Sequence, residues 1–191
     1  MLRIVALLLV ALCLCAQNAT RFAELTAKGI AYLDQGKFNE ALNSLEEVWE
    51  QDQSDVVVAE SLAMAYLYAD HNLIKAKALD EQAIASGGKA SFFVQHPHEK
   101  IGFVSGDMVE FCTGRLSVSR ERLIFTSKDP KHSFVVDKGQ IKEFKANHVY
   151  GASRGMYHIR TADKKDYNFR PRSWSEEEQQ LILQLVNEHL R

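Results

Sequence analysis

The feature that most constrains the fold is the regular spacing of apolar residues between residues 110 and 144. Leu116 and Val118 share one face of an extended chain, and Leu123 and Phe125 repeat the same two-residue period. A period of two is typical of a β-strand with one buried face. Turn-forming residues separate these runs, so the segment predicts three antiparallel strands.

Two further segments extend the predicted sheet. Residues 91–96 are expected to form an opening strand, and the alternating runs 157–159 and 167–169 flank a polar turn at residues 162–165. Two alternating runs joined by a short polar turn are typical of a β-hairpin. The sequence therefore predicts a sheet of about six strands.

A single helix is predicted after the sheet. Ser175 and Glu178 have the spacing of a capping box, in which each side chain bonds the backbone N–H of the other residue. The apolar stripe that follows has helical spacing and consists of Leu181, Ile182, Leu185, Val186 and His189. We expect this amphipathic helix to close the sheet.

The order of these elements resembles the pleckstrin-homology superfold, including its GRAM and bacterial variants. The resemblance rests on the pattern Gly114-x-Leu116-x-Val118, Leu123-x-Phe125, His132-x-Phe134 and Ile141, followed by the terminal helix. It implies an antiparallel β-sandwich or barrel with a C-terminal helix. Members of this superfold bind lipid headgroups, peptides or protein surfaces, so the resemblance implies an adaptor rather than an enzyme.

Upstream of the sheet, the chain has the spacing of a helical repeat. The residues of this pattern are Gly29, Tyr32, Gly36, Phe38, Ala41, Leu45 and Val48. These spacings resemble a tetratricopeptide repeat, and a shift of 34 residues places Ala63 on Gly29 and Tyr66 on Tyr32. In the second unit Asp70 replaces the turn glycine. Four helices are expected, at residues 20–34, 38–52, 55–69 and 73–86.

Two repeats are few for an array of this kind. Each repeat buries its apolar face on the next one, and about three are normally needed for stability. The sheet half or a partner is therefore expected to cap the open end. Gly29 is expected to allow close approach of the first two helices, whereas Gly36 and Gly87 are expected to end helices.

The N-terminal residues have the composition of a secretory signal peptide. Arg3 precedes an unbroken apolar run of 12 residues, 4–15, and cleavage is expected after Ala16 or Ala19. This run is shorter than the roughly 20 apolar residues that span a bilayer. We therefore expect a periplasmic or secreted protein, in which Cys112 is the only cysteine left after cleavage.

These patterns together predict an α+β chain with two domains. The expected boundaries are a signal peptide at 1–19, a tetratricopeptide-like helical domain at 20–88 and a pleckstrin-homology-like domain at 90–191. Residues 20–98 carry 6 Lys and Arg against 12 Asp and Glu, whereas residues 99–191 carry 16 against 13. The helical half is thus acidic and the sheet half mildly basic.

The leading functional prediction is an exported, non-enzymatic adaptor or scaffold with a protein or peptide partner. Proteins that resemble tetratricopeptide repeats usually bind such partners on the concave surface formed by the first helix of each pair. The residues that match those positions are Thr26, Ile30, Leu33, Asp34, Glu60, Met64, Leu67 and Tyr68. If exposed, the last three would form an adaptable apolar patch. The alternative is that they pack against the sheet half.

A membrane-surface module is the competing prediction. Residues 131–172 carry 10 Lys and Arg against 4 Asp and Glu, and a basic residue near an anionic membrane contributes about 1 kcal/mol. The candidate lipid contacts are Lys145, Arg154, Lys164, Lys165, Arg170 and Arg172. The same residues also suit an ordinary solvated face. Nucleic acid is not expected as a partner, because the chain has no aromatic stacking platform.

Metal binding and catalysis have weaker support in the sequence. His96 and His98 alternate on one strand and offer two nitrogen ligands, but no cysteine or carboxylate lies at a supporting spacing. Cys112 suits a small buried side chain better than a nucleophile, since nothing in the sequence pairs it with a histidine. We predict no catalytic residue, no metal site and no cofactor.

Overall fold

The computed structural model describes residues 2–97, 111–146 and 156–190, with side chains from Thr20 onward. Within these residues the fold is α+β, as predicted: four helices precede a seven-stranded antiparallel sheet, and a fifth helix follows it. The helices are α1 (Leu2–Gln35), α2 (Phe38–Trp49), α3 (Val56–Ala69), α4 (Leu73–Ala85) and α5 (Glu176–His189). The strands are β1 (Ala90–Pro97), β2 (Phe111–Val118), β3 (Arg122–Ser127), β4 (Phe134–Asp137), β5 (Ile141–Ala146), β6 (Tyr157–Thr161) and β7 (Asp166–Pro171).

Capping residues set the start of the inner helices. The Asp55 carboxylate accepts the backbone N–H of Val57 at 2.8 Å and begins α3, and the Asn72 side chain accepts that of Lys75 at 3.1 Å and begins α4. Two helix boundaries differ from the prediction by more than one residue. α1 starts at residue 2 rather than 20, and α2 ends at Trp49 rather than at residue 52.

Residues in the left-handed conformation follow the helices. Gly36 has a φ of 74° after α1 and Gly87 has a φ of 89° after α4, as predicted. After α3 the positive φ, 50°, belongs to His71, whereas Asp70 keeps a right-handed conformation. The positive φ after α3 thus lies one residue later than the 34-residue shift predicts.

The first two helices approach closely at Gly29. A Cβ atom on Gly29 would lie 2.6 Å from Cγ of Leu45, whose side chain is fully buried. Ala41 of α2 is also fully buried. Small residues at both positions let the two helices pack, which confirms the expected role of Gly29.

The strands form an antiparallel sheet in the order β4-β3-β2-β1-β7-β6-β5, in which two runs of consecutive strands, β1 to β4 and β5 to β7, join through the pairing of β1 with β7. β1 lies at its centre, pairing with β2 along its whole length and with β7 through Val94 and Gln95. Residues 111–146 supply four strands rather than three, because a turn at Gly139, with a φ of 82°, divides β4 from β5. An antiparallel sheet followed by a C-terminal helix is what the pleckstrin-homology resemblance implies.

Helix α5 packs against the sheet through its predicted apolar stripe. The Ser175 hydroxyl accepts the backbone N–H of Glu178 at 3.1 Å, which is half of the expected capping box. The other half is not formed, because the Glu178 carboxylate accepts hydrogen bonds from Tyr68 and Ser173 instead. The buried residues of the stripe are Leu181, Ile182, Leu185 and Val186.

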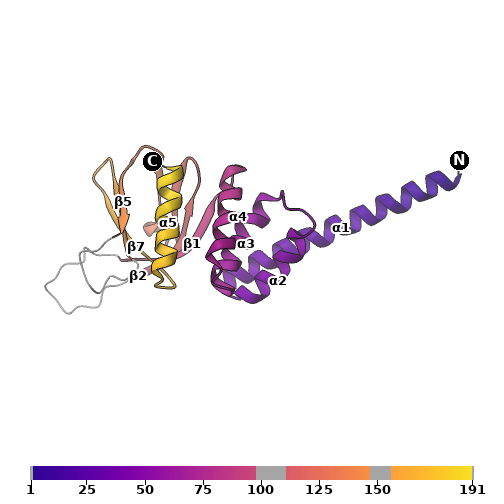
Figure 1. Cartoon of the computed structure of the whole chain (residues 1–191), viewed down its shortest axis with the longest axis horizontal. Coiled ribbons are helices and arrows are strands. Elements are labelled where there is room, and N and C mark those ends of the chain that lie inside the picture. The colour runs from indigo at the N-terminus through magenta and orange to yellow at the C-terminus, as the bar shows by residue number, and fades with distance from the viewer. Residues whose placement is uncertain (1, 98–110, 147–155, 191) are drawn as a thin grey trace.

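The helical half and the sheet half share one hydrophobic core. α3 and α4 contact β1, and α4 also contacts α5, so the sheet half packs against the second pair of helices. Leu67 of α3 and Phe92 of β1 belong to the same buried cluster. Figure 1 shows the two halves side by side, with the first part of α1 extending away from both. The expectation that the sheet half caps the short array is therefore met.

Candidate functional site

Some residues of the predicted concave surface are buried in the core, and others are accessible to solvent. Leu33, Met64 and Leu67 are only 3%, 3% and 5% exposed, so they do not form the apolar patch considered for a partner. They pack into the core that joins the two halves, which is the alternative stated for this patch. A side chain without access to solvent is not available to a partner, so these three residues are not part of the candidate site.

Tyr68 lies at the contact between the two halves. Its hydroxyl donates to Oε1 of Glu178 at 2.6 Å and accepts the backbone N–H of Phe93 at 2.8 Å. Its ring packs between those of Phe38 and Phe93, with centroid distances of 5.2 Å to each. Burial raises the pKa of Tyr68 well above its usual value. This residue holds the sheet half on the helices.

Two further residues of the predicted surface also contact the sheet half. The Glu60 carboxylate accepts the backbone N–H of Lys89 at 2.9 Å, next to the start of β1. Asp34, at the end of α1, forms an ion pair of 2.7 Å with Arg115 of β2. Half-burial raises the pKa of Glu60, and the Lys89 backbone bond partly offsets that effect.

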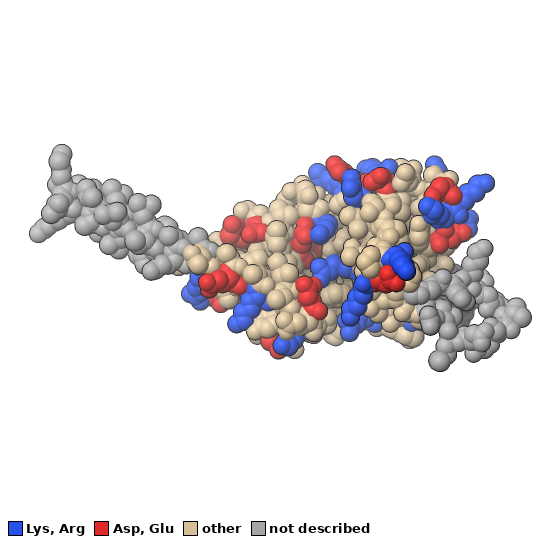
Figure 2. Space-filling model, turned by 180° about the vertical axis from the view of Figure 1, so that it is seen from behind, with Lys and Arg blue, Asp and Glu red and all other residues tan. Residues whose placement is uncertain are grey.

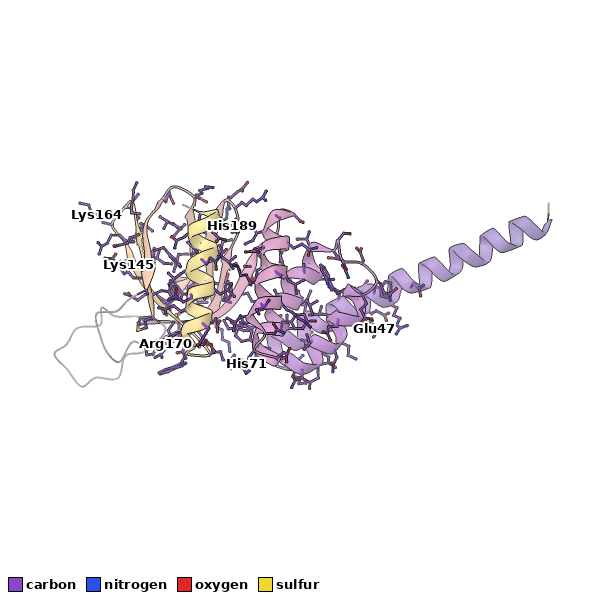
Figure 3. The ribbon with its side chains drawn as sticks, viewed as in Figure 1. Glu47, His71, Lys145, Lys164, Arg170 and His189 are labelled. Carbon is purple, nitrogen blue, oxygen red and sulfur yellow. The ribbon has the colours of Figure 1, made fainter. Side chains whose placement is uncertain are left out.

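The remaining two predicted residues, Thr26 and Ile30, line an open groove, which we name the helical groove. It has a volume of about 500 Å³ and lies between α1, the α2–α3 turn and the first turn of α3. Its walls are mostly apolar; its residues are Phe22, Ala23, Thr26, Ala27, Ile30, Val48, Asp52, Asp55 and Val57. Val57 is half exposed, at 50%. Glu47, next to Val48, lies on the side of the helices away from the sheet (Figure 3).

The rim of the helical groove carries two carboxylates. Asp52 accepts hydrogen bonds from the side chain and the backbone N–H of Ser54, which lower its pKa. Asp55 accepts the backbone N–H groups of Val57 and Val58. These bonds fix both carboxylates beside an apolar floor. The groove therefore suits a partner segment in which an apolar side chain lies next to a positively charged one.

The predicted lipid contacts do not form one basic surface. Lys145 pairs with Glu143, and Lys165 pairs with Asp163 at 2.9 Å. Lys164 and Lys165 precede β7, whereas Arg170 and Arg172 lie at its other end. Figure 3 shows Lys145 and Lys164 well apart from Arg170, and Figure 2 shows acidic and basic side chains interspersed on one face. Arg154 lies outside the described residues.

Arg170 has a structural position instead. It is 6% exposed, and its Nε and Nη2 donate to Oε1 of Gln95 at 3.1 and 2.7 Å. Its guanidinium lies 3.3 Å from the ring centroid of Trp174 and 4.7 Å from that of Phe111. Desolvation lowers the pKa of Arg170. A buried, stacked guanidinium is not available to a membrane surface.

The histidine and cysteine candidates also have structural partners. Nδ1 of His96 bonds the Asn168 carbonyl at 2.8 Å, and the imidazole packs 4.9 Å from the ring of Phe169. Cys112 is partly buried, and desolvation raises the pKa of its thiol. His98 lies outside the described residues. Across the described part of the chain, no three His, Cys, Asp or Glu residues are grouped as metal ligands.

Comparison with known proteins adds little to this picture. The chain matches no protein-family model and no curated protein. Among solved structures, it is similar to the C-terminal domain of an unknown protein from Leishmania infantum, with 16% identity, a TM-score of 0.39, and coverage of 53% of this chain and 82% of that one. It is also similar to the Slm1-PH domain in complex with phosphoserine, with 11% identity, a TM-score of 0.35, and coverage of 49% and 87%.

A third similar structure contains the linker-DH/PH domains of p115-RhoGEF. The identity is 9%, the TM-score is 0.39, and the match covers 90% of this chain and 55% of that one. TM-scores this low carry no argument about function, which therefore depends on the residues of the site. Among the helices that the structure describes, none combines the length and apolarity needed to cross a membrane.

Proposed function

We propose that this chain is a non-enzymatic adaptor that holds a segment of a partner protein in the helical groove. One observation supports this most directly. Thr26 and Ile30, chosen from the repeat pattern alone, line the part of the concave surface that remains open. Leu33, Met64 and Leu67 of that surface are buried in the core instead. The sheet thus stabilises a short helical array and leaves one end of it accessible.

The groove favours a partner segment with a large apolar side chain next to basic residues. Ile30 and Val57 supply an apolar contact, and Asp52 and Asp55 place negative charge at the rim. Residues 20–98, which include these two carboxylates, carry a net charge of −6, from 6 basic and 12 acidic residues. Such a field raises the association rate of a basic segment and makes it sensitive to salt.

We also propose that the adaptor acts after export. The support is the sequence of residues 1–19, with its basic start, apolar run and small residues before the expected cleavage positions. The mass of the mature protein purified from its own source tests this directly. A first residue of Gln17 or Thr20 is expected, and a chain that retains residues 4–15 would contradict export by this route.

Site-specific photo-crosslinking tests the groove. A photoreactive amino acid replaces Thr26 in one variant and Ile74, which is 85% exposed on α4 outside the groove, in a control. Each variant is expressed and irradiated in cells of the protein's own source, and the crosslinked peptides are sequenced by mass spectrometry. We expect the Thr26 position to capture a discrete segment with apolar and basic residues that the Ile74 position does not capture.

The captured segment is then made as a synthetic peptide and titrated. Ile30→Glu and Val57→Glu should each weaken its binding at least tenfold, whereas Ile74→Glu should leave it unchanged. Both groove positions are partly or half exposed, so the fold is expected to persist. Equal capture at Thr26 and Ile74, or equal affinity of all three variants, would refute the proposed site.

A further inference from the structure

A second groove lies where the helical half meets the sheet, and we name it the junction groove. It has a volume of about 580 Å³, within the range of small-molecule sites. Its floor is the outward face of β1, β2 and β3, which presents Gln95, Thr113 and Thr126. Asp34, at the end of α1, stands at the helical side. This groove shares no lining residue with the helical groove.

The charge of the junction groove is positive. It is lined by Arg115 of β2, Lys128 directly after β3 and Arg172 directly after β7, and Asp34 is its one carboxylate, which leaves a net charge of +2. Asp34 pairs with Arg115 at 2.7 Å. Lys128 and Arg172 are exposed, and neither is in an ion pair within the described part of the chain. Two cationic charges therefore remain for a ligand.

The geometry also fixes one of the cations. The Arg115 guanidinium lies 5.4 Å from the centroid of the Phe93 ring while Asp34 holds one of its nitrogens. The Arg172 backbone N–H donates to the Phe93 carbonyl at 2.9 Å, which ties the base of that side chain to β1. Arg115 and Arg172 are thus anchored beside β1, the central strand of the sheet, and Lys128 directly follows β3.

We propose that the junction groove binds a small molecule that carries a phosphate monoester. A phosphate monoester has a charge of about −1.5 to −2 near pH 7 and several strong acceptor oxygens. It therefore matches two available cations, and the Thr113 and Thr126 hydroxyls can donate to its oxygens. The ligand would contact both halves of the protein, because Asp34 and Arg115 form one wall of the groove.

Titration of the full-length protein with inorganic phosphate and with glycerol 3-phosphate, at constant ionic strength, tests this site. Saturable shifts of the amide NMR signals of Gln95, Thr113 and Lys128 are expected with both probes. The double substitution Lys128→Gln with Arg172→Gln should weaken binding at least tenfold. The charge-matched control, Lys142→Gln with Lys164→Gln on exposed positions of the sheet half, should leave the affinity unchanged.

Three outcomes would overturn the inference. They are shifts that rise linearly without saturation, equal losses in the two double variants, and binding to vesicles that contain phosphatidic acid without binding to either soluble phosphate. The last outcome would indicate that the basic residues of the groove bind a lipid surface rather than a small molecule. Because the two grooves have separate residues, failure here leaves the proposed adaptor function unaffected, and failure of the adaptor leaves this site unaffected.

Discussion

The Tyr68 hydroxyl donates a hydrogen bond of 2.6 Å to the Glu178 carboxylate and so joins α3 to α5 across 110 residues of sequence. The same oxygen accepts the Phe93 backbone N–H at 2.8 Å, which adds β1 to the contact. Ser173 also donates to Glu178. Burial raises the pKa of Glu178, although the bonds from Ser173 and Tyr68 oppose this effect. One phenol thus connects three elements of the two halves.

Replacing Tyr68 with phenylalanine should weaken the junction. The substitution keeps the ring between Phe38 and Phe93 but leaves the buried Glu178 carboxylate and the Phe93 N–H with one partner fewer. Removing one partner of a buried hydrogen bond costs about 1–3 kcal/mol. Urea denaturation should show a loss of this size in the free energy of unfolding.

Tyr32→Phe is the matched control for that measurement. Tyr32 is half-buried on α1 and contacts Lys28 and Lys37 through its ring, which the substitution preserves. Equal stability of Tyr68→Phe and the wild-type protein would show that the hydroxyl does not stabilise the junction. A double-mutant cycle with Glu178→Gln would then measure any remaining coupling between the two side chains.

Gly29→Ala tests the close contact of α1 and α2. Alanine favours a helix over glycine by about 1 kcal/mol, but a Cβ atom 2.6 Å from Cγ of Leu45 overpacks the contact by about 1–3 kcal/mol. We expect a net loss of stability on the order of 1 kcal/mol. In a Leu45→Ala background the contact has room, so Gly29→Ala should become stabilising. The same sign in both backgrounds would contradict the packing account.

The local elements could be predicted because their causes lie within a few residues. The period of two at Leu116 and Val118 places both side chains in the core, where they pair in register with Phe92 and Ala90 of β1. The start of α5 could be predicted for the same reason, since Ser175 satisfies an N–H only three residues away. Sequence patterns capture interactions of this range directly.

The site could be predicted only in part, because burial depends on distant partners. An apolar Met64 or Leu67 suits an exposed patch and an interface equally well, and only the docking of the sheet half decides between them. Sequence reasoning missed Val57 and Asp52 of the helical groove. The signal was present in Asp55, a helix cap that places Val57 in the first turn of α3 beside α1.

Arg170→Lys should destabilise the sheet half although it keeps the charge. Lysine has no planar fork for the two bonds to Gln95 and no guanidinium to stack on Trp174. We expect a loss of about 1–2 kcal/mol in the free energy of unfolding, with altered Trp174 fluorescence. Arg172→Lys, at an exposed position two residues away, is the control and should have no effect. Equal midpoints for both variants would count against the stacking contribution.

Asp80 of α4 should make stability depend on pH. It is 2% exposed, and its Oδ1 has no hydrogen-bond partner among the described residues. Burial raises its pKa well above the usual value, and the nearby Glu60 and Glu81 add to this effect. The unfolded chain therefore loses this proton near pH 4, whereas the folded chain retains it to higher pH. The contribution of Asp80 to stability is thus most favourable at low pH and falls as pH rises through the unfolded value.

Asp80→Asn removes this titration and should be more stable than the wild-type protein at neutral pH. We expect a higher free energy of unfolding at pH 7, because the wild-type protein must there either keep Asp80 protonated or bury its charge. The gain should shrink as the pH is lowered toward 4, because the wild-type side chain is then protonated in both states. Urea denaturation at several pH values measures it, with Glu24→Gln, at an exposed position of α1, as the control. A difference between Asp80→Asn and wild type that stays constant across this range would show that Asp80 ionises equally easily in the folded and unfolded chain.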